Sequence, residues 1–116
     1  MTRVGYYKVV SRKGTGFITM VLTMPAKGVA GQVNVGVSFC SPRDQFCRER
    51  GKRIAAGRLI ATEDRLVPHT FALTSNGEAL STGKLCDQVL EMMRSGNRKL
   101  PKWCENATFT YGLRRR

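Results

Sequence analysis

The most restrictive pattern in the chain is the alternation in residues 31–41, GQVNVGVSFCS. Apolar side chains recur at every second position, at Val33, Val35, Val37 and Phe39. Side chains of a β-strand point to opposite faces in turn, so this period predicts a strand with one face buried. Because a strand needs hydrogen-bonded neighbours, the chain must build a sheet around it.

Two further stretches predict the neighbouring strands. Residues 4–24, VGYYKVVSRKGTGFITMVLTM, are rich in β-formers on both sides of the turn sequence RKGTG and predict a hairpin. Residues 58–74, RLIATEDRLVPHTFALT, predict strand, turn and strand, with Pro68 restricting the second strand to an edge or to its own start. Residues 107–113, ATFTYGL, predict a last alternating strand.

The stretch SPRDQFCRERGKRIAAGR, residues 41–58, predicts the first helix. Ser41 is suited to cap it, and a proline and an aspartate follow at positions typical of a first turn. We expect the helix to run to about Ala56 and to stop at Gly57. Arg58 then either leaves the helix or lies partly buried beside an anion, which is a carboxylate (Asp44, Glu63 or Asp64) or a ligand phosphate.

A second helix is predicted over residues 81–95, capped by Ser81 or Thr82 and stopped by Gly96. Its expected buried residues are Leu85, Cys86, Val89, Met92 and Met93. The fold class that results is α+β: one domain over residues 1–116, an antiparallel sheet with two helices on one face, in the order β-β-β-α-β-β-α-β.

The charge of the chain restricts the classes of partner that it is expected to bind. There are 20 Lys and Arg residues against 8 Asp and Glu, a net charge of +12, and the first 40 residues contain no acid. Such an excess opposes compaction unless anions neutralise it. Nucleic acid, a nucleotide, an anionic membrane surface or an acidic protein would do so, and a merely soluble basic protein is the alternative.

Catalysis has little support in the residue types. The chain has one histidine, His69, no acid pair and no nucleotide-binding glycine motif of the G-x-x-x-x-G-K-[ST] type. The four cysteines lack C-x-x-C spacing, so we expect free, mostly buried thiols in preference to a zinc site or disulfides. We therefore expect no enzyme activity, no catalytic residue, no metal and no cofactor.

Anion binding has better support. An arginine can bind phosphate through two parallel hydrogen bonds, and an aromatic ring can stack on a base. The glycine-rich RKGTGF turn is a plain hairpin turn or a place where backbone N–H groups face a phosphate. The residues predicted to bind ligand are Arg43, Arg48, Lys52, Arg58, Phe17, Phe71, Arg94 and Arg98. Core packing for the rings and a solvated helix face for the cations are the competing interpretations.

Residues 35–59 carry a resemblance to a known family. A strand ends in Phe-Cys, Ser-Pro-x-Asp-x-Phe follows, and a basic helix ends in Ile-Ala-x-Gly-Arg-Leu. This block is similar to the first-described Thoeris anti-defence family of phage proteins. The resemblance covers roughly a fifth of the chain and extends to no ligand residue outside the block, so Arg94, Arg98 and Lys102 are considered for their charge and position alone.

The resemblance implies a sponge that binds cyclic ADP-ribose isomers, and in some members cyclic oligonucleotides, without cleaving them. It implies a homo-oligomer with ligand at the subunit interfaces, acting in the host cytoplasm during infection. A nucleic-acid-binding protein and an inhibitor that docks on an acidic host protein are the alternatives. No signal peptide or bilayer span is predicted, because the nine-residue apolar run GFITMVLTM is too short.

Overall fold

Five strands form one antiparallel sheet, and the computed structural model describes residues 2–25, 31–60, 70–75, 81–95, 100–104 and 106–112, with backbone alone for residues 59, 60 and 70–75. The strands are β1 (Thr2–Ser11), β2 (Gly14–Thr23), β3 (Gly31–Cys40), β4 (Thr70–Ser75) and β5 (Thr108–Tyr111). Their order across the sheet is β4-β3-β2-β1-β5. The helices are α1 (Arg48–Ile60), α2 (Thr82–Ser95) and the short 3₁₀ helix η2 (Lys102–Cys104). The predicted α+β class, an antiparallel sheet with two helices, is confirmed.

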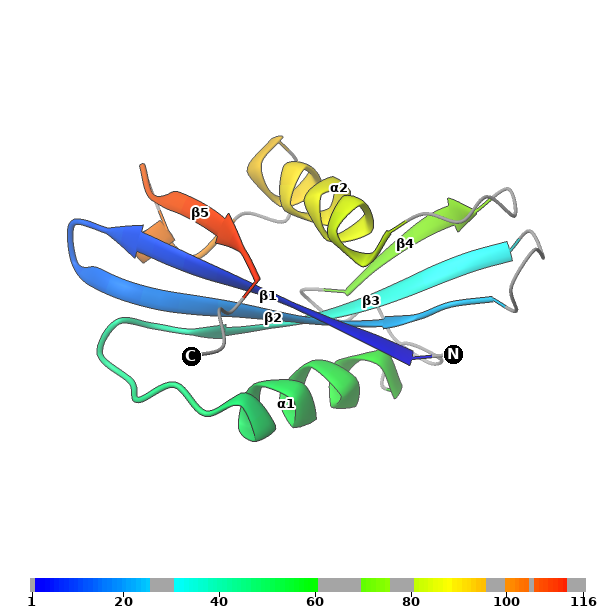
Figure 1. The fold of residues 1–116 in the computed structure, drawn as a ribbon, viewed down its shortest axis with the longest axis horizontal. Coiled ribbons are helices and arrows are strands. Elements are labelled where there is room, and N and C mark those ends of the chain that lie inside the picture. The colour runs from blue at the N-terminus through cyan, green and yellow to red at the C-terminus, as the bar shows by residue number, and fades with distance from the viewer. Residues whose placement is uncertain are drawn as a thin grey trace.

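The two helices cover opposite faces of the sheet, with α2 above it and α1 below it in Figure 1. The expectation of both helices on one face was therefore wrong. The reason lies in β2, where five successive residues from Ile18 to Leu22 are buried. A strand covered on both faces has a continuous apolar run, and FITMVLT has this character more than it has strict alternation.

The main core lies between the sheet and α2. It contains side chains of three strands and of α2, almost all of them fully buried: Tyr7, Val9, Ile18, Met20, Leu22, Val33, Val35, Val37, Leu85, Cys86, Val89, Leu90 and Met93. Ser81 caps α2 as predicted, since its Oγ accepts a hydrogen bond from the Lys84 N–H at 3.2 Å. Met92 is 40% exposed, so its predicted burial was wrong, and the predicted stop at Gly96 lies outside the described residues.

Residues 41–44 form a turn instead of the start of α1. The Asp44 N–H donates to the Ser41 carbonyl at 3.0 Å, and Ser41 Oγ donates to the Asp44 carboxylate at 3.0 Å. Serine at the first position and proline at the second also favour a β-turn, so the same letters fit both structures. The helix begins only at Arg48.

The predicted end of the first helix was also wrong, because α1 continues through Gly57 to Ile60. Space beside Gly57 is open, and its φ is not among the positive values found at Gly14 and Gly112 in the described residues. A glycine ends a helix through a left-handed conformation, which Gly57 does not adopt. The first strand expected in residues 58–74 is thus helical as far as Ile60, and residues 61–69 lie outside the described residues. The second strand of that stretch is β4, which begins at Thr70.

Helix α1 approaches the sheet closely because Gly51 has no side chain. A Cβ at this position would lie 2.7 Å from Thr19 Oγ1, closer than two such atoms can approach. Ser38 Oγ donates to the Gly51 carbonyl at 2.8 Å, and Ala55 is fully buried next along the helix. Small and hydroxyl-bearing residues therefore make this contact, in contrast to the large apolar side chains under α2.

Candidate functional site

Three segments far apart in the sequence meet at one end of the sheet. Residue Phe17 of β2 pairs with Cys40, so the β1–β2 turn lies beside the end of β3. Val10 of β1 pairs with Thr108, so the same turn lies beside the segment that precedes β5, which contains η2. The order β3-β2-β1-β5 thus brings Lys13, the Ser41–Asp44 turn and η2 together.

Trp103 of η2 lies over Gly16 of β2. A Cβ on Gly16 would fall 2.4 and 2.5 Å from two carbons of the indole ring, so only glycine leaves room for the ring. Two backbone hydrogen bonds hold η2 itself, from the Cys104 N–H to the Pro101 carbonyl at 2.9 Å and from the Ala107 N–H to the Cys104 carbonyl at 3.2 Å. The ring of Trp103 is half-buried, with part of its surface left open to solvent.

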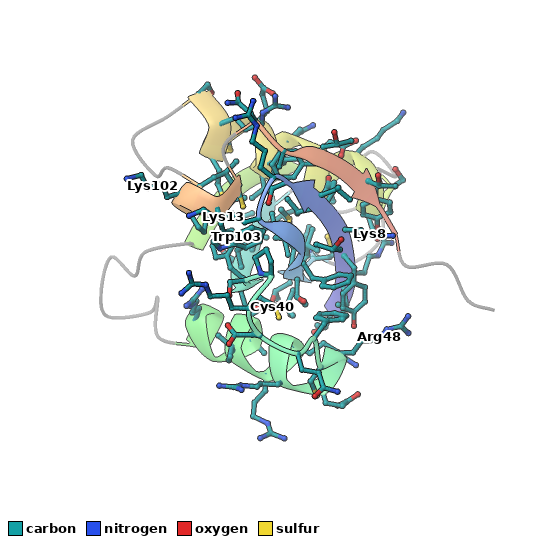
Figure 2. The ribbon with its side chains drawn as sticks, turned by 90° about the vertical axis from the view of Figure 1, so that its left-hand side faces the viewer. Lys8, Lys13, Cys40, Arg48, Lys102 and Trp103 are labelled. Carbon is teal, nitrogen blue, oxygen red and sulfur yellow. The ribbon has the colours of Figure 1, made fainter. Side chains whose placement is uncertain are left out.

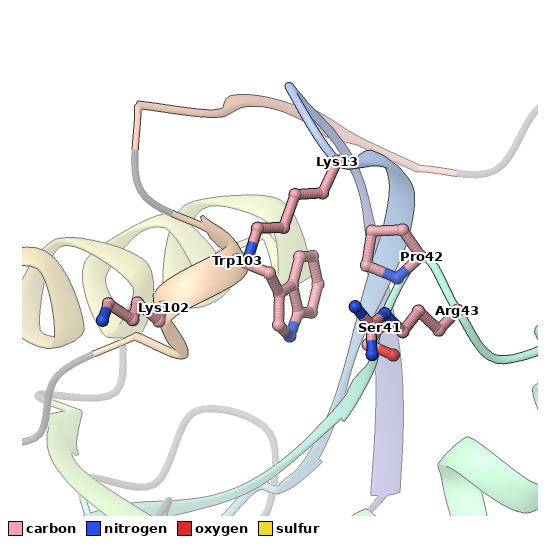
Figure 3. A pocket seen from close by; sticks show the side chains of 6 residues that line it. All are labelled: Lys13, Ser41, Pro42, Arg43, Lys102 and Trp103. Atoms are coloured by element: carbon pink, nitrogen blue, oxygen red, sulfur yellow. The ribbon is translucent and has the colours of Figure 1, made fainter.

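A cavity of about 450 Å³ opens beside this ring, lined by Lys13, Ser41, Pro42, Arg43, Lys102 and Trp103. Figure 3 shows Lys13 reaching toward the ring, with Lys102 on one side of it and Pro42 and Arg43 on the other. Of the described residues in the lining, half are cations and none is an acid. None of these cations forms an ion pair with a carboxylate in the part of the chain that the structure describes.

Such an arrangement suits a planar, anionic ligand. Unneutralised cations around a concave surface raise the local concentration of anions, and the arginine can bind phosphate through two N–H groups at once. The indole offers a flat apolar surface on which a nucleobase can stack. The volume lies within the range of roughly 300–1,000 Å³ that is usual for small-molecule sites.

Of the predicted residues whose side chains the structure describes, Arg43 alone lines this cavity. Arg48 and Lys52 lie on α1, away from it. The Arg48 guanidinium lies 5.7 Å from the centre of the Tyr6 ring, and Lys52 Nζ lies 3.9 Å from the carboxylate of the exposed Glu49. Figure 2 shows Lys13, Lys102 and Trp103 grouped at one end of the sheet, with Arg48 apart from them.

Arg58 is half-buried, and its guanidinium donates a hydrogen bond to the Val37 carbonyl of β3. Pairing of β3 with β4 ends at Gly36, so Arg58 binds the residue next after the paired stretch. Burial lowers the pKa of Arg58, but an arginine stays protonated at physiological pH. Its described partner is a backbone carbonyl; of the three carboxylates considered for it, Glu63 and Asp64 lie outside the described residues.

The predicted stacking rings are differently placed. Phe17 already stacks on Phe46, with ring centres 4.1 Å apart and planes 16° apart, and Tyr6 meets Phe46 edge-on at 6.3 Å. The side chain of Phe71 lies outside the described residues. Arg94, at the end of α2, lies 5.6 Å from the centre of the Phe109 ring and lines a second cavity, while Arg98 lies outside the described residues.

Lys13 and Trp103 were not predicted as ligand residues from the sequence, and Lys102 was considered only for its charge and position. Local signals were present: the turn sequence RKGTGF offers backbone N–H groups to a phosphate, and the basic sequence RKLPKW contains the only tryptophan of the chain. What neither segment showed was that it lies beside the other, since that depends on the strand order.

The cysteines divide by burial, with Cys86 and Cys104 buried, Cys40 half-buried and Cys47 exposed. Burial raises the pKa of the Cys86 and Cys104 thiols to about 12, and burial, with the nearby Asp44 charge, raises that of Cys40. These thiols therefore stay protonated at neutral pH, and a protonated thiol is a poor nucleophile and metal ligand. Among the described residues, no three His, Cys, Asp or Glu side chains are close enough to hold a metal ion.

In the described part of the chain, neither helix has the length and apolar character needed to cross a bilayer. Comparison with protein-family models, curated proteins and solved structures finds no match for this chain.

Proposed function

We propose that the protein binds a phosphate-bearing nucleotide signal and sequesters it without cleaving it. The observation that carries the proposal is the cavity at the end of the sheet, where a half-exposed Trp103 is surrounded by Lys13, Arg43 and Lys102. An indole can stack on a base, and lysine and arginine can form charge-assisted hydrogen bonds to phosphate.

The absence of cleavage is part of the proposal. Among the described residues, the cavity lining offers one hydroxyl, that of Ser41, whose O–H donates to the Asp44 carboxylate within the turn. Asp44 is not itself among these lining residues, and neither is a histidine that could act as general base. The buried thiols are protonated. A ligand held here would meet cations and a ring, which bind a nucleotide and leave its bonds intact.

The resemblance of residues 35–59 to the Thoeris anti-defence family suggests which nucleotide. We propose cyclic ADP-ribose isomers, with cyclic oligonucleotides as a second group, intercepted in the host cytoplasm during phage infection. The cations around the cavity are exposed, so another subunit placed over it would enclose the ligand more fully. We therefore propose a homo-oligomer with ligand at the subunit interface.

The test uses the fluorescence of Trp103, the only tryptophan in the chain. Titration with cyclic ADP-ribose isomers and cyclic trinucleotides should change the emission and saturate. Arg43→Gln should weaken binding roughly 10- to 100-fold, as expected for one charge-assisted group. Arg53→Gln, the same change at an exposed position of α1 that does not line the cavity, should leave affinity within about twofold.

Two outcomes would replace this function. If long RNA or DNA binds, with a steep dependence on salt and equal losses in Arg43→Gln and Arg53→Gln, the protein is a nucleic-acid binder. If mass spectrometry of the ligand released by heating finds a cleaved product in amounts above one per chain, the protein is an enzyme.

A further inference from the structure

A second cavity, of about 720 Å³, lies on the other side of η2. Its lining includes Arg94 from the end of α2, Asn106, Phe109 of β5 and, again, Lys102. Lys102 therefore lines both cavities, while the next two residues divide between them: Trp103 lines the first and Cys104 the second. A single turn of 3₁₀ helix separates the two spaces.

Two polar side chains of the second cavity, Arg94 and Asn106, have no hydrogen bond or ion pair to the residues that the structure describes, whereas Ser95 donates its Oγ–H to the Glu91 carbonyl at 2.7 Å. Arg94 lies over the Phe109 ring, and no ion pair or hydrogen bond joins its guanidinium to any residue that the structure describes. Asn106 has φ of 56°, a left-handed conformation that asparagine adopts more readily than most residues, and this turn places it in the cavity lining. Its exposed amide can donate to an anion.

The cavities are held in a fixed relation to each other. Cys104 is 2% exposed and anchors η2 in the core, and Trp103 fills the space above Gly16. The backbone hydrogen bonds at both ends of η2 leave it little freedom to turn. Each side thus offers its own arginine and its own aromatic ring, with one shared lysine between them.

We infer that the second cavity is a further phosphate-binding compartment, so that one ligand with two separated phosphates occupies both cavities and passes Lys102 between them. This rests on the proposed function of the first cavity and narrows the class of ligand that fills both cavities to a dinucleotide or larger, in which a nucleoside separates the phosphates. A cyclic ADP-ribose isomer, whose two phosphates form one diphosphate, would occupy the first cavity alone. One phosphate binds near Arg43 and Lys13, the other near Arg94 and Asn106. The positive charge of Lys102 is close to both.

The test compares two probes that differ by one nucleotide. Adenosine 5′-monophosphate carries one phosphate, and the linear dinucleotide pApA carries two. The Kd of each is measured by Trp103 fluorescence and calorimetry for the unaltered protein and for Arg43→Gln, Arg94→Gln and Lys102→Gln. Arg53→Gln is the control for loss of one charge.

We expect pApA to bind at least tenfold more tightly than the mononucleotide, because two charge-assisted contacts add. Arg94→Gln should lower the affinity for pApA roughly tenfold and leave the affinity for the mononucleotide within twofold. Arg43→Gln and Lys102→Gln should lower the affinity for both probes. Asn106→Gly provides a second variant, since glycine adopts φ of 56° without strain and removes the amide alone. This variant should weaken the binding of pApA severalfold and change the binding of the mononucleotide little.

The two proposals fail in different ways. If Arg43→Gln weakens both probes while Arg94→Gln and Asn106→Gly leave pApA unchanged, the first cavity binds nucleotide and the second compartment is refuted. If Arg94→Gln weakens the mononucleotide as much as pApA, one compartment near η2 is sufficient and the bipartite site is refuted. If Arg43→Gln changes neither probe, the proposed function itself fails.

Discussion

The two faces of the sheet bury different kinds of side chain. Under α2 the sheet presents large apolar side chains such as Ile18, Met20 and Leu22, all fully buried. Under α1 it presents Thr19 and Ser38, and the helix meets them with Gly51. Buried apolar area stabilises a fold far more than hydroxyl contacts do. The α2 side should therefore supply most of the stability, and α1 should be held by close fit.

The two sides of the sheet also differ in where the cations and the cavities lie. Helix α1 has exposed Arg48, Arg50 and Arg53, while its inner face has little apolar surface. The candidate site lies instead beside η2, with Cys104 anchored in the core on the α2 side. A binding site needs a rigid support, and the better-packed half of the molecule provides it. This comparison teaches that the greatest density of basic residues in the sequence is not where the cavities form.

The largest expected effect comes from the α2 face. Ile18→Ala should lower the free energy of unfolding by about 2–5 kcal/mol, since it leaves a void in a fully buried position. Thr19→Ala changes the next residue of β2, which faces α1, and should lower the free energy of unfolding clearly less than Ile18→Ala does. Chemical denaturation measures both, with Val10→Ala, 47% exposed, as the control. Equal losses at positions 18 and 19 would show that the two faces contribute alike.

A smaller effect is expected where α1 meets β3. Arg58→Ala should lower the free energy of unfolding by roughly 1–2 kcal/mol, because the Val37 carbonyl loses a charged donor at a half-buried place. Arg53→Ala, exposed on the same helix, should change it by less than about 0.5 kcal/mol. Thermal melts and nucleotide titrations of both variants test this. An unchanged melting temperature with weakened ligand binding would instead make Arg58 a ligand residue.

The smallest effect separates two glycines of α1. Gly57→Ala should stabilise the protein by about 0.5–1 kcal/mol, because alanine is the better helix former and space there is open. Gly51→Ala gains the same propensity, but its Cβ would press on Thr19 and force the helix outward. Its stability should fall at least 1 kcal/mol below that of Gly57→Ala, as denaturant midpoints would show. Equal gains at both positions would mean that α1 does not rest on Gly51.

The fold class followed from the sequence because alternation and helix periodicity are local signals. The Val33–Phe39 repeat was sufficient to require a sheet, and Ser81 marked its helix correctly. The predictions from sequence failed where the same residues are compatible with two local structures. Ser41 and Pro42 begin a turn as readily as a helix, and Gly57 is a helix stop only if it adopts a left-handed conformation.

The candidate site was less predictable for a different reason. Lys13, Arg43 and Trp103 are separated by long stretches of chain and meet only because β1 and β2 lie between β3 and β5. Charge alone favoured α1, where cations are most frequent in sequence. Nothing in a local pattern reports that a glycine on one strand leaves room for a ring from a distant loop.

The contact between Gly16 and Trp103 has a consequence for how such proteins diverge. The indole of Trp103 occupies the space that a side chain at position 16 would need, so the residues at positions 16 and 103 depend on each other. A change from glycine at position 16 alone would displace the indole, and a change to a smaller residue at position 103 alone would leave a gap. Related chains should therefore vary at these two positions jointly, so that a side chain at position 16 is accompanied by a small residue at position 103.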